Sequence, residues 1–264
     1  MSRGNQGGEV SNSLQAITVQ HVNFAYHRND LVLEDISFEV QCGQSLCILG
    51  INGVGKTTLL NLIVGLLKPK SGRAIINQAV AHSYRDVFLL TDMSNLSEDM
   101  SVRDNIAFKI MLMNRHRTSR NDTRPNMGSL EEEPLIKAFE LEDQLDKKVS
   151  TLSSGMRKRV GIVTGMLFNP RIIMLDEPTN SIDPLTRQLL IEYMNELHKA
   201  GRTLLTVTHD LEFCWKTATR VVILNNRQII KDMMLGEYKS FEDFSYAAGL
   251  TSQAIHKDFG ITTT

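Results

Sequence analysis

The chain has 264 residues, of which 42% are hydrophobic and 22% are charged, and its formal net charge at pH 7 is −1. This length suits one large domain or two small ones, and the composition is that of an ordinary water-soluble globular protein. The balanced charge argues against a nucleic-acid-binding protein that depends on bulk positive charge. No apolar run reaches the roughly 18 residues that a membrane-spanning helix needs.

The N-terminus is rich in glycine, serine and asparagine and has no apolar stretch typical of a signal peptide. We therefore expect residues 1–15 to be a disordered tail. The three cysteines, Cys42, Cys47 and Cys214, show no metal-binding or redox spacing. Two of them lie in or beside predicted strands, where we interpret them as small buried hydrophobic residues. This use of cysteine predicts a reducing, cytosolic environment.

The first predicted strand covers residues 17–26, which alternate in polarity, and it ends at Tyr26. Tyr26 is interpreted in two ways, as a side chain that stacks on a purine ring or as an aromatic partner across a strand pair. Residues 31–40 predict a second strand pair. A short apolar strand over residues 46–49 follows Gly43.

A glycine-rich loop follows that apolar strand and opens into a helical pattern, and this order makes it a phosphate-binding loop rather than an ordinary turn. Its backbone N–H groups and the helix N-terminus bind anions, while the glycines permit close approach of the phosphates. Lys56 is expected on the β- and γ-phosphates, and the Thr57 hydroxyl on Mg²⁺. The loop reads Gly50-Ile51-Asn52-Gly53-Val54-Gly55-Lys56-Thr57-Thr58.

The middle of the chain predicts short strands over residues 73–77 and 86–90, and a helix over residues 101–113 that begins with a capping serine. Residues 114–134 are rich in charge, contain two prolines and have almost no large apolar residue. We expect them to form an exposed insertion that cannot bury a core. A short helix over residues 135–145 follows.

A second candidate phosphate site lies in residues 152–156, which read Leu-Ser-Ser-Gly-Met and precede another predicted helix. Ser153 and Gly155 are placed to bind an anion at the helix N-terminus, although a serine there is usually only a cap. Arg157, Lys158 and Arg159 are interpreted as a solvated face of the helix.

Two acidic residues follow the buried strand predicted over residues 171–175. Ligand sites in open parallel sheets lie at the carboxyl ends of strands. Asp176 is therefore expected to bind Mg²⁺, and Glu177 to accept a proton from an attacking water. The strand over residues 203–208 ends at His209, which we expect at the same edge of the sheet, although a lone histidine there is as often an ordinary surface residue.

Alternating apolar strands and amphipathic helices predict an α/β fold whose sheet is covered on both faces. Together, the motifs resemble those of the ATP-binding cassette (ABC) ATPases, the nucleotide-binding subunits of ABC transporters, over residues 17–234. The resemblance implies a P-loop NTPase core with a mainly parallel sheet, an N-terminal antiparallel β subdomain and a helical signature subdomain over about residues 93–168. The cassette would cover residues 16–240, and residues 241–264 would form a C-terminal helix and tail.

The resemblance also assigns roles. The glycine loop is similar to the Walker A motif, residues 152–156 to the LSGGQ signature, residues 172–176 to the Walker B strand, and residues 181–183 to the D-loop. The catalytic residues would be Glu177, His209 (the switch histidine) and Lys56. The ATP-binding residues would be Tyr26, Gly50, Asn52, Gly53, Gly55, Lys56, Thr57, Thr58, Ser153 and Gly155, and the Mg²⁺ ligands Thr57, Asp92 and Asp176.

Three positions depart from the family pattern. Asp92 stands where the family has the glutamine of its Q-loop, so it offers a shorter side chain without an amide donor. Ser154 replaces the first glycine of the signature, and Met156 replaces its glutamine. Because Ser153 and Gly155 are retained, we predict an active ATPase that turns over slowly.

The resemblance implies two cassettes in a head-to-tail dimer, with each ATP between the Walker A loop of one copy and the signature of the other. The expected cofactors are ATP and Mg²⁺, and the expected partners are a second cassette, as a homodimer, and integral membrane transporter subunits, without nucleic acid. The protein would be peripheral, at the cytoplasmic face of the membrane. The compact cassette and Asp92 favour export. A soluble ATPase that assembles another complex, and a regulatory subunit without turnover, are the alternatives.

Overall fold

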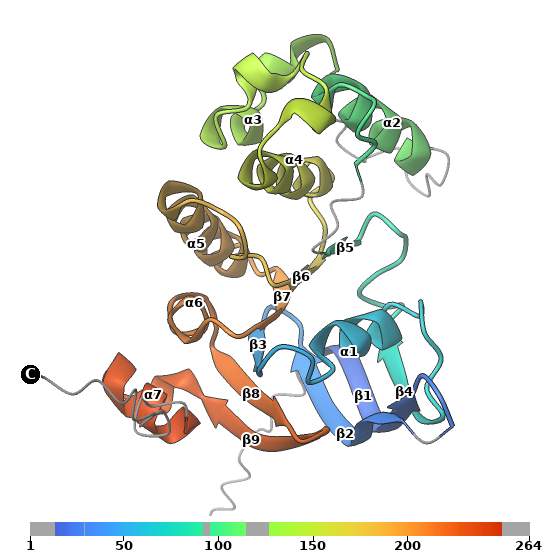
Figure 1. Ribbon diagram of the computed structural model, residues 1–264, viewed down its shortest axis with the longest axis vertical. Coiled ribbons are helices and arrows are strands. Elements are labelled where there is room, and N and C mark those ends of the chain that lie inside the picture. Colours follow the sequence, from blue (N-terminus) through green and yellow to red (C-terminus); the bar gives the residue numbers. More distant parts are fainter. Residues whose placement is uncertain (1–13, 29, 92–95, 115–126, 250–264) are drawn as a thin grey trace, which may run out of the picture.

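The computed structural model describes residues 14–28, 30–91, 96–114 and 127–249. Most of the expected N-terminal tail lies outside these ranges, but Gln15 already belongs to the first strand. The helices are α1 (Lys56–Ile63), α2 (Val102–Asn114), α3 (Pro134–Ala138), α4 (Ser154–Met166), α5 (Pro184–Lys199), α6 (Leu211–Thr217) and α7 (Phe241–Ala248). Short 3-10 helices cover Met127–Glu132, Glu142–Gln144, Val149–Thr151 and Leu235–Glu237. Figure 1 shows α2, α3 and α4 gathered in the upper part of the molecule, above the sheets.

A six-stranded sheet, in the order β5-β6-β7-β3-β8-β9, forms the centre of the molecule. Its strands pair in parallel except for β9, which pairs antiparallel with β8. A second, antiparallel sheet has the order β2-β1-β4. The strands are β1 (Gln15–Ala25), β2 (Leu31–Gln41), β3 (Ser45–Leu49), β4 (Ser71–Ile76), β5 (Val87–Leu90), β6 (Ile172–Asp176), β7 (Thr203–Thr208), β8 (Arg220–Asn225) and β9 (Gln228–Met234). The predicted fold class is confirmed.

The second strand pair predicted for residues 31–40 is wrong, because β2 is a single strand that pairs with β1 along most of its length. Asp35 adopts a positive φ of 49° in the middle of β2, and the register shifts nearby. The polar residues there form a bulge, which bends a strand without reversing it.

The inner strands β3, β6, β7 and β8 of the central sheet are buried on both faces, as the apolar runs in the sequence predict, whereas β9 at the edge is largely exposed. Alternate residues of β3 enter two different cores. Leu46 and Ile48 pack with α1 and the antiparallel sheet, while Cys47 and Leu49 pack with α6 and α7. The phosphate-binding loop therefore leaves a strand that is fixed from both sides.

The upper part of the molecule packs its helices on α5 and on one face of β5 and β6. Gly165 of α4 lies against the ring of Phe88 in β5, where an added Cβ would stand 1.9 Å from a ring carbon. This contact leaves room only for glycine. It fixes the axis of α4, whose first residues carry the signature.

Two expectations for this part need correction. Leu130, within the segment expected to be an exposed insertion, is fully buried in the core, whereas Glu131 and Glu132 beside it are exposed. Residues 115–126 lie outside the described ranges. The helix expected over residues 135–145 is broken, because Glu140 adopts a positive φ of 53° after α3 ends.

Cys47 and Cys214 form a disulfide that joins β3 to α6, and both are buried, whereas Cys42 is exposed. The burial expected for a cysteine in a strand is confirmed for Cys47, whereas nothing in the sequence indicated its bond to Cys214. Their separation of 167 residues gave the sequence no spacing signal. The pairing also removes the ground on which a reducing environment was expected.

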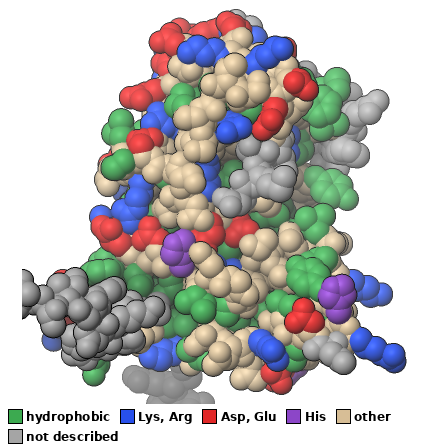
Figure 2. All heavy atoms as spheres, viewed as in Figure 1, with side chains coloured by type: hydrophobic (Ala, Val, Ile, Leu, Met, Phe, Trp, Pro, Cys, Tyr) green, Lys and Arg blue, Asp and Glu red, His purple; other side chains and the backbone are tan. Residues whose placement is uncertain are grey.

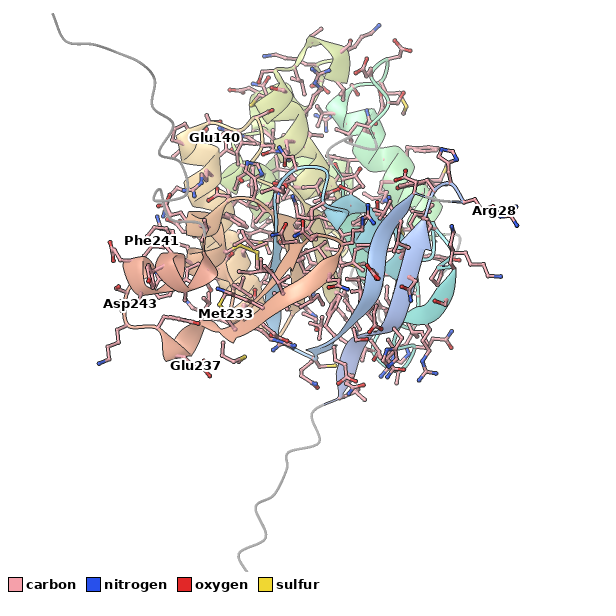
Figure 3. The ribbon with its side chains drawn as sticks, turned by 60° about the horizontal axis from the view of Figure 1, so that its bottom comes forward. Arg28, Glu140, Met233, Glu237, Phe241 and Asp243 are labelled. Carbon is pink, nitrogen blue, oxygen red and sulfur yellow. A yellow bond between two sulfur atoms is a disulfide. The ribbon has the colours of Figure 1, made fainter. Side chains whose placement is uncertain are left out.

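The C-terminal helix α7 lies beside the end of β9 near Met233, as Figure 3 shows. Phe244 of α7 stacks on Trp215 of α6 with a centroid distance of 5.6 Å, which completes the core around the disulfide. Within the described ranges, none of the helices has both the length and the apolar character needed to cross a membrane.

Candidate active site

The glycine-rich loop connects β3 to α1, and its glycines are required by its geometry. Gly53 and Gly55 have φ values of 80° and 109°, which glycine adopts without steric cost. A Cβ on Gly50 would lie 2.6 Å from the Leu224 carbonyl oxygen. Because Gly55 is the N-cap of α1 and has no side chain to cap it, the first N–H groups of α1 are open to an anion.

Lys56 folds back over this loop. Its ammonium group donates to the carbonyl oxygens of Gly50, at 2.8 Å, and Ile51, at 3.1 Å, and lies 2.9 Å from Oε1 of Glu177. The Lys56 side chain is only 5% exposed. The loop thus holds a buried cation beside a row of backbone donors, which suits a polyphosphate.

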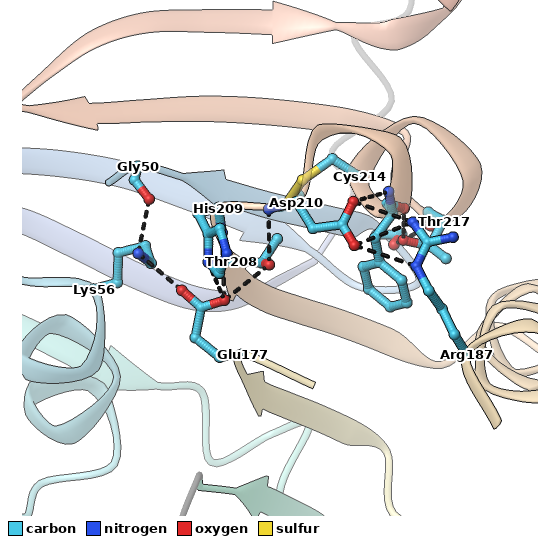
Figure 4. Close-up of a disulfide and its surroundings, with 12 residues drawn as sticks. Gly50, Lys56, Glu177, Arg187, Thr208, His209, Asp210, Cys214 and Thr217 are labelled. Atoms are coloured by element: carbon cyan, nitrogen blue, oxygen red, sulfur yellow. Dashed lines mark hydrogen bonds and ion pairs between the residues drawn. A yellow bond between two sulfur atoms is a disulfide. The ribbon is translucent and has the colours of Figure 1, made fainter. Parts of the chain in front are cut away.

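Glu177 connects Lys56 to the end of the neighbouring strand (Figure 4). Its Oε2 accepts a hydrogen bond from the Thr208 hydroxyl at 3.0 Å and lies 2.9 Å from Nδ1 of His209. Because β6 and β7 are adjacent and parallel, their carboxyl ends bring Glu177 and His209 together. Lys56, Glu177 and His209 therefore meet within one chain. A buried carboxylate beside a cation and an imidazole is placed for general base chemistry on a water molecule.

Tyr26 packs edge-on against Phe24, with ring centroids 4.9 Å apart, and its hydroxyl lies 3.0 Å from Oγ1 of Thr58 in α1. The ring is nevertheless exposed beside the glycine loop. Phe24 belongs to β1, the strand that ends just before Tyr26, so this contact is not a cross-strand pair. The exposed surface of the ring stays available for stacking.

The residues present fit a nucleotide with its metal. Hard oxygen donors suit Mg²⁺, and the chain offers the Thr57 hydroxyl at the start of α1 and the Asp176 carboxylate at the end of β6. Asp176 is 2% exposed, which suits a carboxylate whose charge a cation offsets. Asp92 lies outside the described residues.

The signature residues lie elsewhere, at the start of α4. Ser153 is exposed and caps the helix, accepting a hydrogen bond from the Met156 N–H at 3.2 Å. Gly155 is buried, and an added Cβ would lie 3.3 Å from the Ser181 carbonyl oxygen. Ser153 and Gly155 thus border the segment after β6, and they do not join the cluster of Lys56, Glu177 and His209.

Comparison with known proteins decides the family. A family model described as ABC transporter matches residues 33–180, which is more than half of the chain. The chain belongs to the ABC transporter family. The matched region is the ATPase domain of that family, which binds and hydrolyses ATP.

Relatives and solved structures agree with this assignment. The energy-coupling factor transporter ATP-binding protein EcfA of Malacoplasma penetrans is 32% identical over 252 residues, 92% of this chain and 84% of that protein. The Nod factor export ATP-binding protein I of Burkholderia thailandensis is 30% identical over 225 residues, 83% of this chain and 71% of that protein. A bacterial ABC transporter cassette solved as a dimer has a TM-score of 0.71 and 25% identity, and the match covers 83% of this chain and 98% of that one.

Two basic residues of this ABC cassette contradict the solvated face expected on α4. Lys158 and Arg159 are 7% and 6% exposed. Lys158 donates to the carbonyl oxygens of Glu177 and Asn180, while Arg159 donates to the Asp183 carboxylate and the Thr186 hydroxyl. Because α4 is buried on most sides, polar residues on it need partners. The mainly apolar residues 160–168 after Arg159 were the signal for this burial.

Asp183, in the D-loop segment of the cassette, caps α5 by accepting from the Thr186 N–H at 2.9 Å. Hydrogen bonds from the Thr186 hydroxyl and backbone, and then from the Arg159 guanidinium, hold the pKa of this carboxyl well below its usual range. Arg159 thus fixes the D-loop end of α5 to the signature helix.

Proposed function

We propose that this chain is the ATP-hydrolysing subunit of a transporter whose transmembrane subunits are separate chains, and that it works as a head-to-tail homodimer around two ATP molecules. The proposed dimer is supported by one observation. Within one chain, the two helix N-termini suited to bind an anion, those of α1 and α4, lie apart. The start of α1 belongs to the Lys56 cluster, whereas the start of α4 presents Ser153 to solvent. A second copy would bring the missing half to each site.

The chain's own residues suggest how the reaction proceeds. Lys56 and the loop N–H groups bind the phosphates, Tyr26 stacks on the adenine, and Ser153 with Gly155 of the second copy bind from the opposite side. Glu177 orients the attacking water and accepts its proton, while His209 holds the Glu177 carboxylate through Oε2. Bound Mg²⁺, held by Thr57, Asp176 and Asp92, would neutralise charge that develops on the transferred phosphoryl group.

A groove next to α2 is the proposed contact with the membrane subunits. It has a cavity volume of about 560 Å³ and is lined by apolar residues of β5 and α2 and by Lys109. Phe108, Met111 and Leu112 of α2 are 48%, 53% and 39% exposed. Figure 2 shows hydrophobic side chains at the surface on the side where α2 lies.

The apolar lining and Lys109 favour one occupant of this groove, an amphipathic helix from a membrane subunit. That helix would place a carboxylate beside Lys109. Exposed apolar residues of this extent are typical of an interface. Burial lowers the pKa of Lys109, because the half-buried ammonium is partly removed from water. A carboxylate from the partner would offset that cost. The subunit would then sit at the cytoplasmic face of the membrane.

Export is the proposed direction of transport. It rests on Asp92 in place of the Q-loop glutamine and on the compact cassette. ATP-dependent accumulation of labelled compounds in inside-out vesicles that contain the complex would support export. Accumulation only in right-side-out vesicles would contradict it.

The membrane assignment is tested by purifying the tagged full-length protein from detergent-solubilised membranes and measuring ATP turnover. A polytopic membrane protein should co-purify, and Lys109→Glu should reduce its recovery at least tenfold. Lys199→Glu is the control, because Lys199 is 70% exposed on α5. Turnover should disappear in Glu177→Gln. Soluble partners alone, with turnover intact, would contradict the transporter assignment and favour an ATPase that assembles another complex.

A further inference from the structure

Lys158 lies on the signature helix but points at the segment that carries the catalytic carboxylate. Its ammonium group lies 2.5 Å from the backbone carbonyl oxygen of Glu177 and 3.2 Å from that of Asn180. A lysine that is 7% exposed loses most of its hydration, so these carbonyl groups stabilise it where it is. Through these two backbone contacts, Lys158 acts on the peptide group of Glu177.

The backbone of Glu177 needs such support. Glu177 has a φ of 45°, a left-handed conformation that costs a residue with a side chain free energy unless its surroundings enforce it. Its N–H donates to the Val207 carbonyl oxygen at 2.9 Å, and its own carbonyl also accepts from the Asn180 N–H at 3.2 Å. Hydrogen bonds thus hold both the N–H and the carbonyl group of Glu177, and Lys158 adds a charged donor to the carbonyl oxygen.

The backbone conformation decides where the carboxylate lies. Glu177 directs Oε1 to Lys56 and Oε2 to Thr208 and His209. If its peptide group rotates, both oxygen atoms leave these partners together. A displacement of about 1 Å at a catalytic group can lower the rate by about 100-fold.

We propose that Lys158 is a positioning residue for hydrolysis, which fixes the left-handed backbone of Glu177 and so aims its carboxylate at Lys56 and the attacking water. This inference rests on the proposed role of Glu177 in ATP hydrolysis. It adds a link between the signature helix and the catalytic carboxylate of the same chain.

Lys158→Met tests the proposal, because methionine keeps most of the buried stem and removes the ammonium group. In the full-length protein, kcat for ATP should fall about 10- to 100-fold while KM changes less than about threefold. Lys158→Arg should restore at least a third of kcat, since a guanidinium group also donates to two carbonyl oxygens. Arg157→Met is the matched control on the neighbouring residue, which is partly exposed and pairs with Glu98.

A readout that does not depend on turnover is hydrogen exchange in the nucleotide-free protein. Lys158→Met should accelerate amide exchange at residues 177–181 and leave α5 unchanged. Unchanged exchange at residues 177–181, or a loss of ATP binding that matches the loss of kcat, would overturn the positioning role.

The same measurements separate this inference from the proposed function. If the wild-type chain hydrolyses ATP and Lys158→Met alters kcat and exchange as described, the positioning role holds even where no membrane partner is found. If a membrane partner and ATP-dependent dimer are found while Lys158→Met behaves like Arg157→Met, the positioning role is overturned and the proposed function stands.

Discussion

The starts of α1 and α4 are both suited to bind an anion, yet they are prepared in opposite ways. At α1 the N-cap is Gly55, which has no capping side chain, and Lys56 is buried beside a carboxylate of the same chain. At α4 the N-cap is Ser153, which satisfies the helix itself by accepting from Met156 and remains exposed. The start of α1 is left open and is lined by charged residues of the same chain, whereas the start of α4 already has a capping hydrogen bond.

This difference indicates a division of roles. A start that is open and lined by a buried cation has high affinity for phosphate before any partner arrives. A start that is already capped gives up a hydrogen bond when it accepts a phosphate, so it binds weakly by itself. ATP would therefore bind first at α1 and then draw in the α4 of a second copy. The comparison can be tested by changing each start separately.

The largest effect is expected for Lys56→Met. It removes the buried cation from α1 and leaves Glu177 without its ammonium partner, so ATP turnover should fall about 10³-fold, and ATP affinity should weaken as well. Turnover of radiolabelled ATP and titration with a fluorescent nucleotide measure the two effects. Lys199→Met, on the exposed face of α5, should match the wild type. Equal ATP affinity in Lys56→Met and wild type would contradict the high phosphate affinity assigned to the start of α1.

Ser153→Asp should separate binding from turnover. Aspartate is a good N-cap, so α4 keeps its hydrogen bond, but its charge repels the phosphate of ATP. Turnover should fall about 100-fold, while the isolated chain binds nucleotide as before. Ser150→Asp, at an exposed serine three residues earlier, is the control. A matching loss of nucleotide affinity in Ser153→Asp would mean that both starts serve one site within the chain.

Tyr26→Ala should have a smaller effect, confined to the α1 side. Loss of ring stacking should weaken ATP binding about tenfold, with kcat nearly unchanged at saturating ATP. Tyr26→Phe keeps the ring and removes only the hydrogen bond to Thr58, so its affinity should stay within about twofold of the wild type. Affinity as low in Tyr26→Phe as in Tyr26→Ala would assign the role to the hydroxyl instead.

Asp183→Ala should have the smallest effect and should depend on pH. It removes the cap of α5 and a partner of Arg159; because the side chain is 47% exposed, solvent screening limits the loss to about 1 kcal/mol. The folded protein lowers the pKa of Asp183. Its contribution is therefore fully present above the unfolded pKa of about 3.9 and is lost as pH falls through the lower folded value.

Urea unfolding of wild type and Asp183→Ala at pH 6 and at the lowest pH where both still fold measures this contribution. The difference in the free energy of unfolding should shrink toward the acidic end. Asp143→Ala, at an exposed carboxylate, is the control. A difference that stays constant with pH would assign the stabilisation to packing rather than to the ionised cap.

Local patterns made much of this arrangement predictable. The glycine loop, the strand that ends at Asp176 and the strand that ends at His209 each carry their signal within a few residues, and the adjacency of β6 and β7 brings Glu177 to His209. Partners far apart in the sequence gave no such signal. Lys158 reaches a carbonyl group 19 residues away, and Cys47 reaches Cys214 across 167 residues.

Other errors have the same cause. Leu130 lies in a polar stretch, and only the folded upper part shows that this one side chain enters the core. Residues 31–40 suggest a strand pair and form a single strand with a bulge at Asp35, because polar residues in a strand give the same signal whether the chain bends or reverses. The groove beside Lys109 forms from β5, α2 and α4, which no single stretch of sequence contains.

In the proposed dimer, each ATP site takes its two helix starts from two copies of the chain. Sedimentation velocity of Glu177→Gln, which should bind ATP without hydrolysing it, tests this claim most directly. We expect a monomer without nucleotide, a dimer with Mg²⁺ and ATP, and a monomer again with ATP when Ser153→Asp is added. A dimer that forms equally well with the altered signature, or a monomer under all three conditions, would contradict it.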